Sequence, residues 1–115
     1  MNVNKGTLYW ITGLSGSGKT TIAQILYNHL RSKYSNIILL DGDVLREALG
    51  VKNYCYDKKS RKNIAMQYVR LAKIFTDQGI NVVFATISMY DEVRNWNKVN
   101  IVKYIEIYIK VPFNK

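Results

Sequence analysis

The residues Gly13-Leu14-Ser15-Gly16-Ser17-Gly18-Lys19-Thr20 match the pattern G-x-x-x-x-G-K-[ST] of a phosphate-binding loop. The apolar run Leu8–Thr12 before it predicts a strand, and Thr21–Leu30 after it has apolar residues at helical spacing. In such a unit the glycines let backbone N–H groups point at phosphate oxygens, and the helix N-terminus adds partial positive charge. The alternative is a Gly/Ser-rich surface loop, which the flanking strand and helix disfavour. The loop therefore predicts a nucleotide site.

The backbone, the lysine and the threonine of this loop have separate predicted roles. Lys19 is a catalytic candidate because its ammonium group would reach the β- and γ-phosphates. The hydroxyl of Thr20 would take one position on Mg²⁺. ATP and Mg²⁺ are therefore the expected cofactors. The residues expected to bind ATP are Gly13, Leu14, Ser15, Gly16, Ser17, Gly18, Lys19, Thr20 and Thr21.

The composition is that of one small globular domain, residues 1–115, with a strong positive charge. Of its residues 48% are hydrophobic, and 17 Lys and Arg against 8 Asp and Glu give a net charge of +9. This charge attracts anions, but the basic residues are scattered and no nucleic-acid-binding motif is found. A single cysteine, Cys55, excludes an intramolecular disulfide and fits a cytoplasmic setting. No apolar run has the length of a membrane span, and none marks a signal peptide.

Strand-like and helix-like segments alternate along the chain, which predicts an α/β fold with a parallel sheet and helices on both faces. In such sheets ligands bind beyond the carboxyl ends of the strands, so Gly13–Thr20, Asp41–Asp43 and Thr86–Tyr90 should share one edge. The expected strands are Leu8–Thr12, Ile37–Leu40, Ile80–Ile87 and Tyr104–Val111, and the expected helices are Thr21–Leu30, Val44–Leu49, Ser60–Gln78 and Asp91–Val99.

Acidic and basic side chains follow the second predicted strand. Asp41 and Asp43 flank a glycine, and beside a phosphate site they could orient Mg²⁺ or accept a proton from an attacking hydroxyl. The alternative is a turn in which Asp43 caps the next helix. Arg46 lies one helical turn beyond Asp43, and with Arg61 it could hold an anionic acceptor, unless both are merely solvated. Ser88 offers a hydroxyl at the same edge.

Three blocks of this sequence, Trp10–Ala23, Leu40–Arg46 and Ala85–Tyr90, resemble the adenylyl-sulfate kinase family. The resemblance implies the three-layer α/β/α fold of P-loop NTPases. It also implies transfer of the γ-phosphate of ATP to the ribose 3′-hydroxyl of adenylyl sulfate, with Mg²⁺, as in sulfate assimilation. The site residues that it implies are Lys19, Asp41 and Asp43 for catalysis, Thr20 and Asp41 for the metal, and Asp43, Arg46, Arg61, Ile87 and Ser88 for the acceptor.

The departures from the family pattern lie on the acceptor side. The family motif D-R-x-E-N-I-R-R becomes Ser60–Met66, in which Arg61 aligns but alanine and methionine replace the arginine pair. The family motif I-S-P-Y-R becomes Ile87–Asp91, in which an acid replaces a base. The segment Ile87–Asn97 is similar to a kinase-like branch found with capsule polysaccharide genes, which includes cytidine diphosphoramidate kinase. That reaction is the alternative prediction.

The resemblance also predicts a chain that is truncated at its C-terminus. The family continues past the last strand into a basic lid, an adenine-contacting loop and a further strand, whereas this sequence stops at Lys115. A nucleotide-binding remnant with little turnover and a basic nucleic-acid-binding module are therefore the alternatives to an active enzyme. The expected partner is a small nucleotide acceptor, a homodimer is left open, and no membrane partner is expected.

Overall fold

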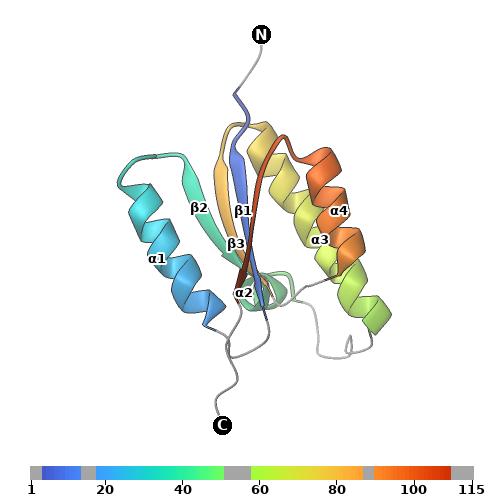
Figure 1. The fold of residues 1–115 in the computed structure, drawn as a ribbon. Helices are drawn as coiled ribbons and strands as arrows, with labels where there is room; N and C mark the ends of the chain where they lie inside the picture. Colours follow the sequence, from blue (N-terminus) through green and yellow to red (C-terminus); the bar gives the residue numbers. More distant parts are fainter. Residues whose placement is uncertain (1–3, 14–17, 51–57, 87–89, 110–115) are drawn as a thin grey trace.

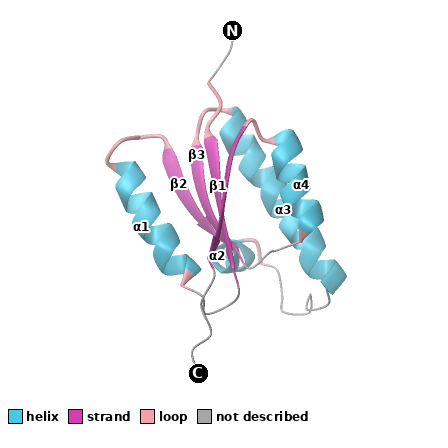
Figure 2. Cartoon of the chain, viewed as in Figure 1, coloured by secondary structure: helices cyan, strands magenta, loops and turns pink. Residues whose placement is uncertain are grey.

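The structure is a computed structural model that describes residues 4–13, 18–50, 58–86 and 90–109, with side chains from residue 62 onward in the third range. Strands and helices alternate along these residues, as Figures 1 and 2 show. Among the described residues, no helix combines the length and the apolar composition needed to cross a membrane. The elements are β1 (Thr7–Gly13), α1 (Lys19–Arg31), β2 (Ile37–Asp41), α2 (Gly42–Ala48), α3 (Lys58–Asp77), β3 (Asn81–Thr86), α4 (Asp91–Asn100) and β4 (Lys103–Ile109).

The described strands form one parallel four-stranded sheet in the order β2-β3-β1-β4. Helix α1 covers one face of this sheet, and α3 and α4 lie side by side on the other (Figure 1). The predicted α/β fold is therefore confirmed, and the boundaries of the expected elements differ only by a few residues. The short helix α2 begins at Gly42, two residues before its expected start, because Asp41 already caps it.

Two apolar layers fill the space between the sheet and its helices. Leu8 and Trp10 of β1 point toward α3 and α4, and Ile11 points toward α1. Strand β3 divides in the same way, with Phe84 on the α3 face and Val83 on the α1 face. Because both faces are covered, the central strands have continuous apolar runs instead of an alternating pattern.

Four apolar residues have helical spacing in α1, namely Ile22, Ile25, Leu26 and Leu30, but they do not all face the core. Ile22 and Ile25 have helical spacing, yet their side chains are 38% and 60% exposed. Leu26 and Leu30, which share this spacing, do pack toward the core, and Ala23 joins them there. Helix α1 contacts β1, β2 and β3, so among the described residues one helix covers this face of the sheet. Part of the apolar surface of α1 stays exposed to solvent.

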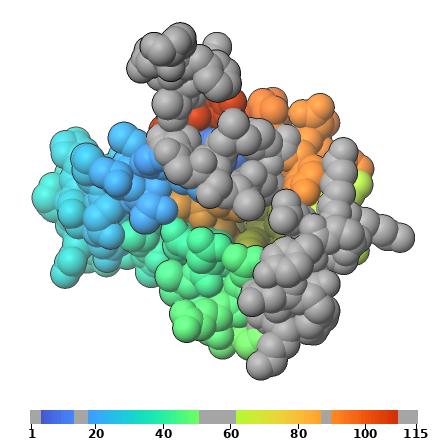
Figure 3. Space-filling view, turned by 90° about the horizontal axis from the view of Figure 1, so that it is seen from below, coloured from blue at the N-terminus to red at the C-terminus, as the bar shows by residue number. Residues whose placement is uncertain are grey.

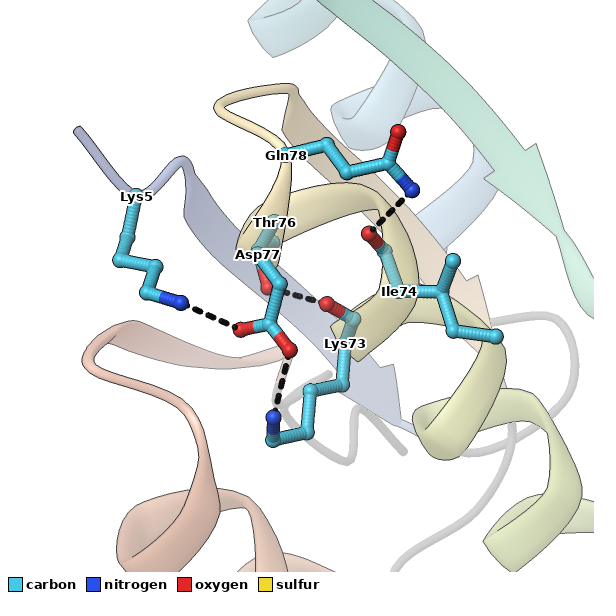
Figure 4. A network of polar contacts seen from close by, with 6 residues as sticks. All are labelled: Lys5, Lys73, Ile74, Thr76, Asp77 and Gln78. Atoms are coloured by element: carbon cyan, nitrogen blue, oxygen red, sulfur yellow. Dashed lines mark hydrogen bonds and ion pairs between the residues drawn. The ribbon is translucent and has the colours of Figure 1, made fainter. Parts of the chain in front are cut away.

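The edge of the sheet where the strands begin is held by contacts between the start of β1 and the end of α3. Figure 4 shows the carboxylate of Asp77 between two lysines, with Lys5 Nζ at 3.3 Å and Lys73 Nζ at 2.6 Å. The hydrogen bond from Lys73 is the main cause of a lowered Asp77 pKa. Gly6 passes so close to Ile80 that a Cβ atom would overlap the Ile80 carbonyl, which explains the glycine at this position.

A polar network ties α4 to β4. Arg94 donates to Glu106 Oε2 from Nε at 2.8 Å and from Nη2 at 2.7 Å. The Tyr104 hydroxyl donates to Glu106 Oε1 at 2.8 Å and accepts from Asn97 Nδ2 at 3.3 Å. Burial would raise the pKa of Glu106, but the hydrogen bonds from Arg94 and Tyr104 outweigh it, so the Glu106 pKa lies below its usual 4.5. The glutamate at this strand position therefore contributes to the packing of α4.

We expect Glu106→Gln to lower the free energy of unfolding at neutral pH by about 1–2 kcal/mol, because a charge-assisted hydrogen-bond pair is lost. Since the pKa of Glu106 is depressed in the folded state, its contribution is present above pH 4.5 and is lost as the pH falls through the lower folded-state pKa. The stability of the variant should therefore fall less steeply with acid than that of the wild type. Urea unfolding at several pH values measures this, with exposed Glu47→Gln as the control. Parallel acid profiles for Glu106→Gln and the wild type would contradict the assignment.

Candidate functional site

Strands β1, β2 and β3 end at one edge of the sheet. The register pairs Thr12 of β1 with Thr86 of β3, and Ala85 of β3 with Asp41 of β2, so three strands end at almost the same level. This edge lies at the bottom of Figure 1, next to α2, and Figure 3 looks onto it, with α1 on one side and α4 on the other. Gly13–Thr20, Asp41–Asp43 and Thr86–Tyr90 are predicted to share an edge, and this prediction is confirmed for those of these residues that the structure describes.

Gly18 makes the transition from the loop into α1. Its φ of +90° and ψ of 13° lie in the left-handed region, which glycine adopts without the steric cost of a Cβ atom. The first hydrogen bond of the helix follows at once, from Ile22 N to the Gly18 carbonyl at 3.0 Å. No side chain of the described residues caps this end and no acid lies in its first turn, so its N–H groups can bind an anion.

Lys19 and Thr20 are the first two residues of α1, and both lie at the sheet edge. The Lys19 side chain is half-buried and that of Thr20 is exposed. The Thr20 hydroxyl lies 3.5 Å from Asp41 Oδ2, at the outer limit of a hydrogen bond. Two residues that are separated by all of α1 and β2 in the sequence are therefore brought together, as the phosphate-site prediction requires.

Asp41 uses its two carboxylate oxygens in different directions. Oδ1 accepts hydrogen bonds from the backbone N–H groups of Asp43 at 2.8 Å and Val44 at 3.4 Å, which makes Asp41 the N-cap of α2. Oδ2 points toward Thr20 of the loop helix. The alternative in which Asp43 caps this helix is wrong, because Asp43 is already the second residue of α2.

Asp43 and Arg46 form an ion pair on the outer surface of α2. Asp43 Oδ1 lies 2.6 Å from Arg46 Nη2, and the Asp43 side chain is 86% exposed against 38% for Arg46. The expectation that both residues face the same way is confirmed. Because the pair is exposed, its two charges are accessible to a ligand, and its own contribution to stability is small.

The sequence reading missed one side chain that reaches this site from α3. Helical spacing within Ser60–Gln78 puts Tyr68 on the same face as Ile64 and Leu71, which predicts a core residue, and Tyr68 is only 6% exposed. Its hydroxyl, however, donates to the Gly42 carbonyl of the acidic turn at 3.3 Å. Burial raises the pKa of Tyr68, while nearby Arg46 lowers it and Asp43 raises it. Helical spacing identifies the ring as a core residue but carries no signal for the hydrogen bond.

Several predicted site residues lie outside what the structure describes. The loop residues Leu14, Ser15, Gly16 and Ser17 and the acceptor candidates Ile87 and Ser88 are among them. For Arg61 the backbone belongs to α3, but its side chain is outside the description. The predicted site residues whose side chains or backbone turns the structure describes are therefore Gly13, Gly18, Lys19, Thr20, Thr21, Asp41, Asp43 and Arg46.

The oxygen donors at Thr20 and Asp41 fit the chemistry of Mg²⁺. This ion usually binds one or two protein carboxylates and completes its shell with waters and substrate phosphates. No cluster of three His, Cys, Asp or Glu side chains that could hold a metal exists within the described ranges, so a caged metal centre is not present there. One hydroxyl and one carboxylate beside a phosphate-binding helix end are compatible with a metal that arrives with its nucleotide.

The parallel sheet and this edge have the arrangement of a P-loop α/β fold. Residues 5–115 match the adenylylsulphate kinase family, and the chain belongs to that family. Cytidine diphosphoramidate kinase from Campylobacter jejuni is 48% identical over 112 residues, which cover 97% of this chain and 65% of the relative. Adenylyl-sulfate kinase from Deinococcus deserti is 33% identical over 111 residues, which cover 96% and 61%. The chain thus spans slightly less than two thirds of the length of these relatives.

Solved structures agree with this assignment. The APS kinase CysC from Mycobacterium tuberculosis, in complex with AMPPNP and APS, superposes with a TM-score of 0.82 at 26% identity. The superposition covers 96% of this chain and 66% of that one. The family resemblance that the loop and acidic motifs implied is therefore confirmed.

The divided role of Asp41 can be tested by two substitutions. Asp41→Ala removes the helix cap and should lower the free energy of unfolding by about 1 kcal/mol. Asp41→Asn keeps an oxygen that can accept from the same N–H groups, so its stability should stay within about 0.5 kcal/mol of the wild type. Urea unfolding measures both, with Asp43→Asn as a control that caps nothing. Equal stability of Asp41→Ala and the wild type would contradict the capping role.

Proposed function

We propose that this chain is the core of an ATP-dependent kinase that transfers the γ-phosphate to the ribose 3′-hydroxyl of a nucleotide acceptor. The observation that carries the proposal is the meeting of Thr20, at the start of the loop helix, with Oδ2 of Asp41 at the carboxyl edge of a parallel sheet. Membership of the adenylylsulphate kinase family supports it.

In the proposed reaction the chain acts by positioning and by charge neutralisation. The backbone of Gly13–Thr20 and the end of α1 bind the phosphates, and Lys19 neutralises charge on the transferred group. Thr20 and Asp41 would hold Mg²⁺, which when bound neutralises charge on the β- and γ-phosphates. Asp43 lies on the acceptor side, where its carboxylate can accept the proton of the attacking hydroxyl.

The anionic acceptor is proposed to bind beside Arg46, with Arg61, Ile87 and Ser88 completing its site. Arg46 is well suited because its guanidinium is fixed on α2 and partly exposed. Two acceptors are compatible with the relatives, adenylyl sulfate and cytidine diphosphoramidate. The higher identity to the Campylobacter jejuni enzyme, 48% against 33% to the Deinococcus deserti enzyme, favours cytidine diphosphoramidate.

The acceptor is tested by measuring ADP formation with ATP, Mg²⁺ and each acceptor in separate reactions. We expect turnover with cytidine diphosphoramidate to exceed that with adenylyl sulfate. Lys19→Ala should lower kcat by at least about a hundredfold, because charge stabilisation of the transferred group is lost. Lys33→Ala is the control, since Lys33 is exposed beyond the far end of α1. Equal rates for Lys19→Ala and the wild type would refute the proposed reaction.

Asp41→Asn separates the metal role of this residue from its helix cap. The amide keeps the cap but loses the negative charge, so the Mg²⁺ concentration at half-maximal rate should rise by about tenfold or more. Binding of ATP in the presence of EDTA should change little, because the loop backbone is untouched. Titration of activity with Mg²⁺ and calorimetry without it measure the two effects. An unchanged Mg²⁺ dependence would remove Asp41 from the metal site.

A further inference from the structure

Helix α2 carries the acidic turn and packs at the margin of the core, where its Leu45 is half-buried. None of its residues, Gly42–Ala48, is fully buried, and Val44 is 63% exposed. A helix this short is marginal without tertiary contacts, because few of its backbone hydrogen bonds close within it. The position of Asp43 and Arg46 therefore depends on the contacts that fix the first turn of α2.

Tyr68 provides such a contact from the opposite side of the turn. Its hydroxyl donates to the Gly42 carbonyl at 3.3 Å, and its ring lies against the turn, since a Cβ atom on Gly42 would be 3.8 Å from Tyr68 Cε2. The same Cβ position is 3.7 Å from Thr86 Oγ1 and 3.8 Å from the Ala85 carbonyl. The turn is thus seated between the end of β3 and a tyrosine of α3.

The ring of Tyr68 is itself held by the most buried part of the molecule. It lies 5.8 Å from the ring of Phe84, which lies 5.1 Å from the ring of Trp10. Both of these partners are fully buried in the central strands of the sheet. The chain of aromatic contacts therefore connects a rigid core to the first turn of α2, with the Tyr68 hydroxyl as its last member.

We propose that Tyr68 is a positioning residue for phosphoryl transfer, which acts through the Gly42 carbonyl to hold Asp43 and Arg46 against the acceptor. This inference rests on the proposed kinase function. Tyr68 itself does not touch the reacting atoms. Its effect comes from the steep dependence of rate on alignment, since a shift of about 1 Å in a reacting group can cost about a hundredfold in rate.

Tyr68→Phe is the direct test, because it keeps the buried ring and removes only the hydroxyl. We expect kcat to fall about tenfold while the KM for ATP stays within about twofold, since the hydrogen bond that is lost is made to Gly42 of α2, whereas ATP is proposed to bind at the start of α1. Amide hydrogen exchange in α2 should become several-fold faster, with exchange in α1 unchanged. Tyr34→Phe is the matched control, because Tyr34 is 44% exposed and lies after α1 at the opposite edge of the sheet.

The outcomes separate this inference from the function on which it rests. If the wild-type chain transfers phosphate and the Tyr68→Phe variant has the same kcat, the inference is overturned and the proposed kinase function remains. If amide hydrogen exchange becomes faster throughout the Tyr68→Phe variant, or if its thermal stability and ATP affinity both fall along with kcat, Tyr68 has a general packing role. That result also overturns the inference. If the wild-type chain transfers phosphate to neither acceptor, the proposed function fails. Exchange in α2 then still reports whether the Tyr68 contact holds the turn.

Discussion

The parallel direction of the strands is the constraint on which the rest of this molecule depends. Parallel neighbours must be joined by crossover connections, which here contain helices, so the carboxyl ends of β1, β2 and β3 lie at one edge. The register places the ends of these strands level with one another. The start of α1 and the turn with two acids therefore become neighbours, although they lie far apart in the sequence.

Asp41 shows how one side chain serves both the fold and the site. Its Oδ1 satisfies N–H groups that the start of α2 would otherwise leave exposed, and this fixes the direction of Oδ2 toward Thr20. A carboxylate bound on one side is pre-oriented for a ligand on the other, so little side-chain entropy is lost when a cation or a phosphate-bound metal arrives. The helix cap is therefore also a determinant of the site.

Much of this arrangement could be predicted from the sequence, and the rest could not for physical reasons. The loop motif and the continuous apolar runs identified the strands and the shared edge, because those patterns depend on local chemistry. The exposure of Ile22 and Ile25 depends on how far a single helix extends across the sheet, which no local pattern encodes. The hydrogen bond from Tyr68 depends on the depth at which α3 packs, so the residue could be recognised only as part of the core.

The ion pair between Asp43 and Arg46 can be exchanged, in the proposed reaction, for a contact between Arg46 and the acceptor. Asp43 is 86% exposed, so the pair contributes little to stability and can be opened at low cost. In the proposed reaction an anionic acceptor competes for Arg46, because a phosphate group offers the guanidinium two parallel hydrogen bonds. In that reaction Asp43 loses its partner when the acceptor arrives, so its carboxylate is released from the ion pair. The proposed reaction thereby couples binding of the acceptor to release of the Asp43 carboxylate through one arginine.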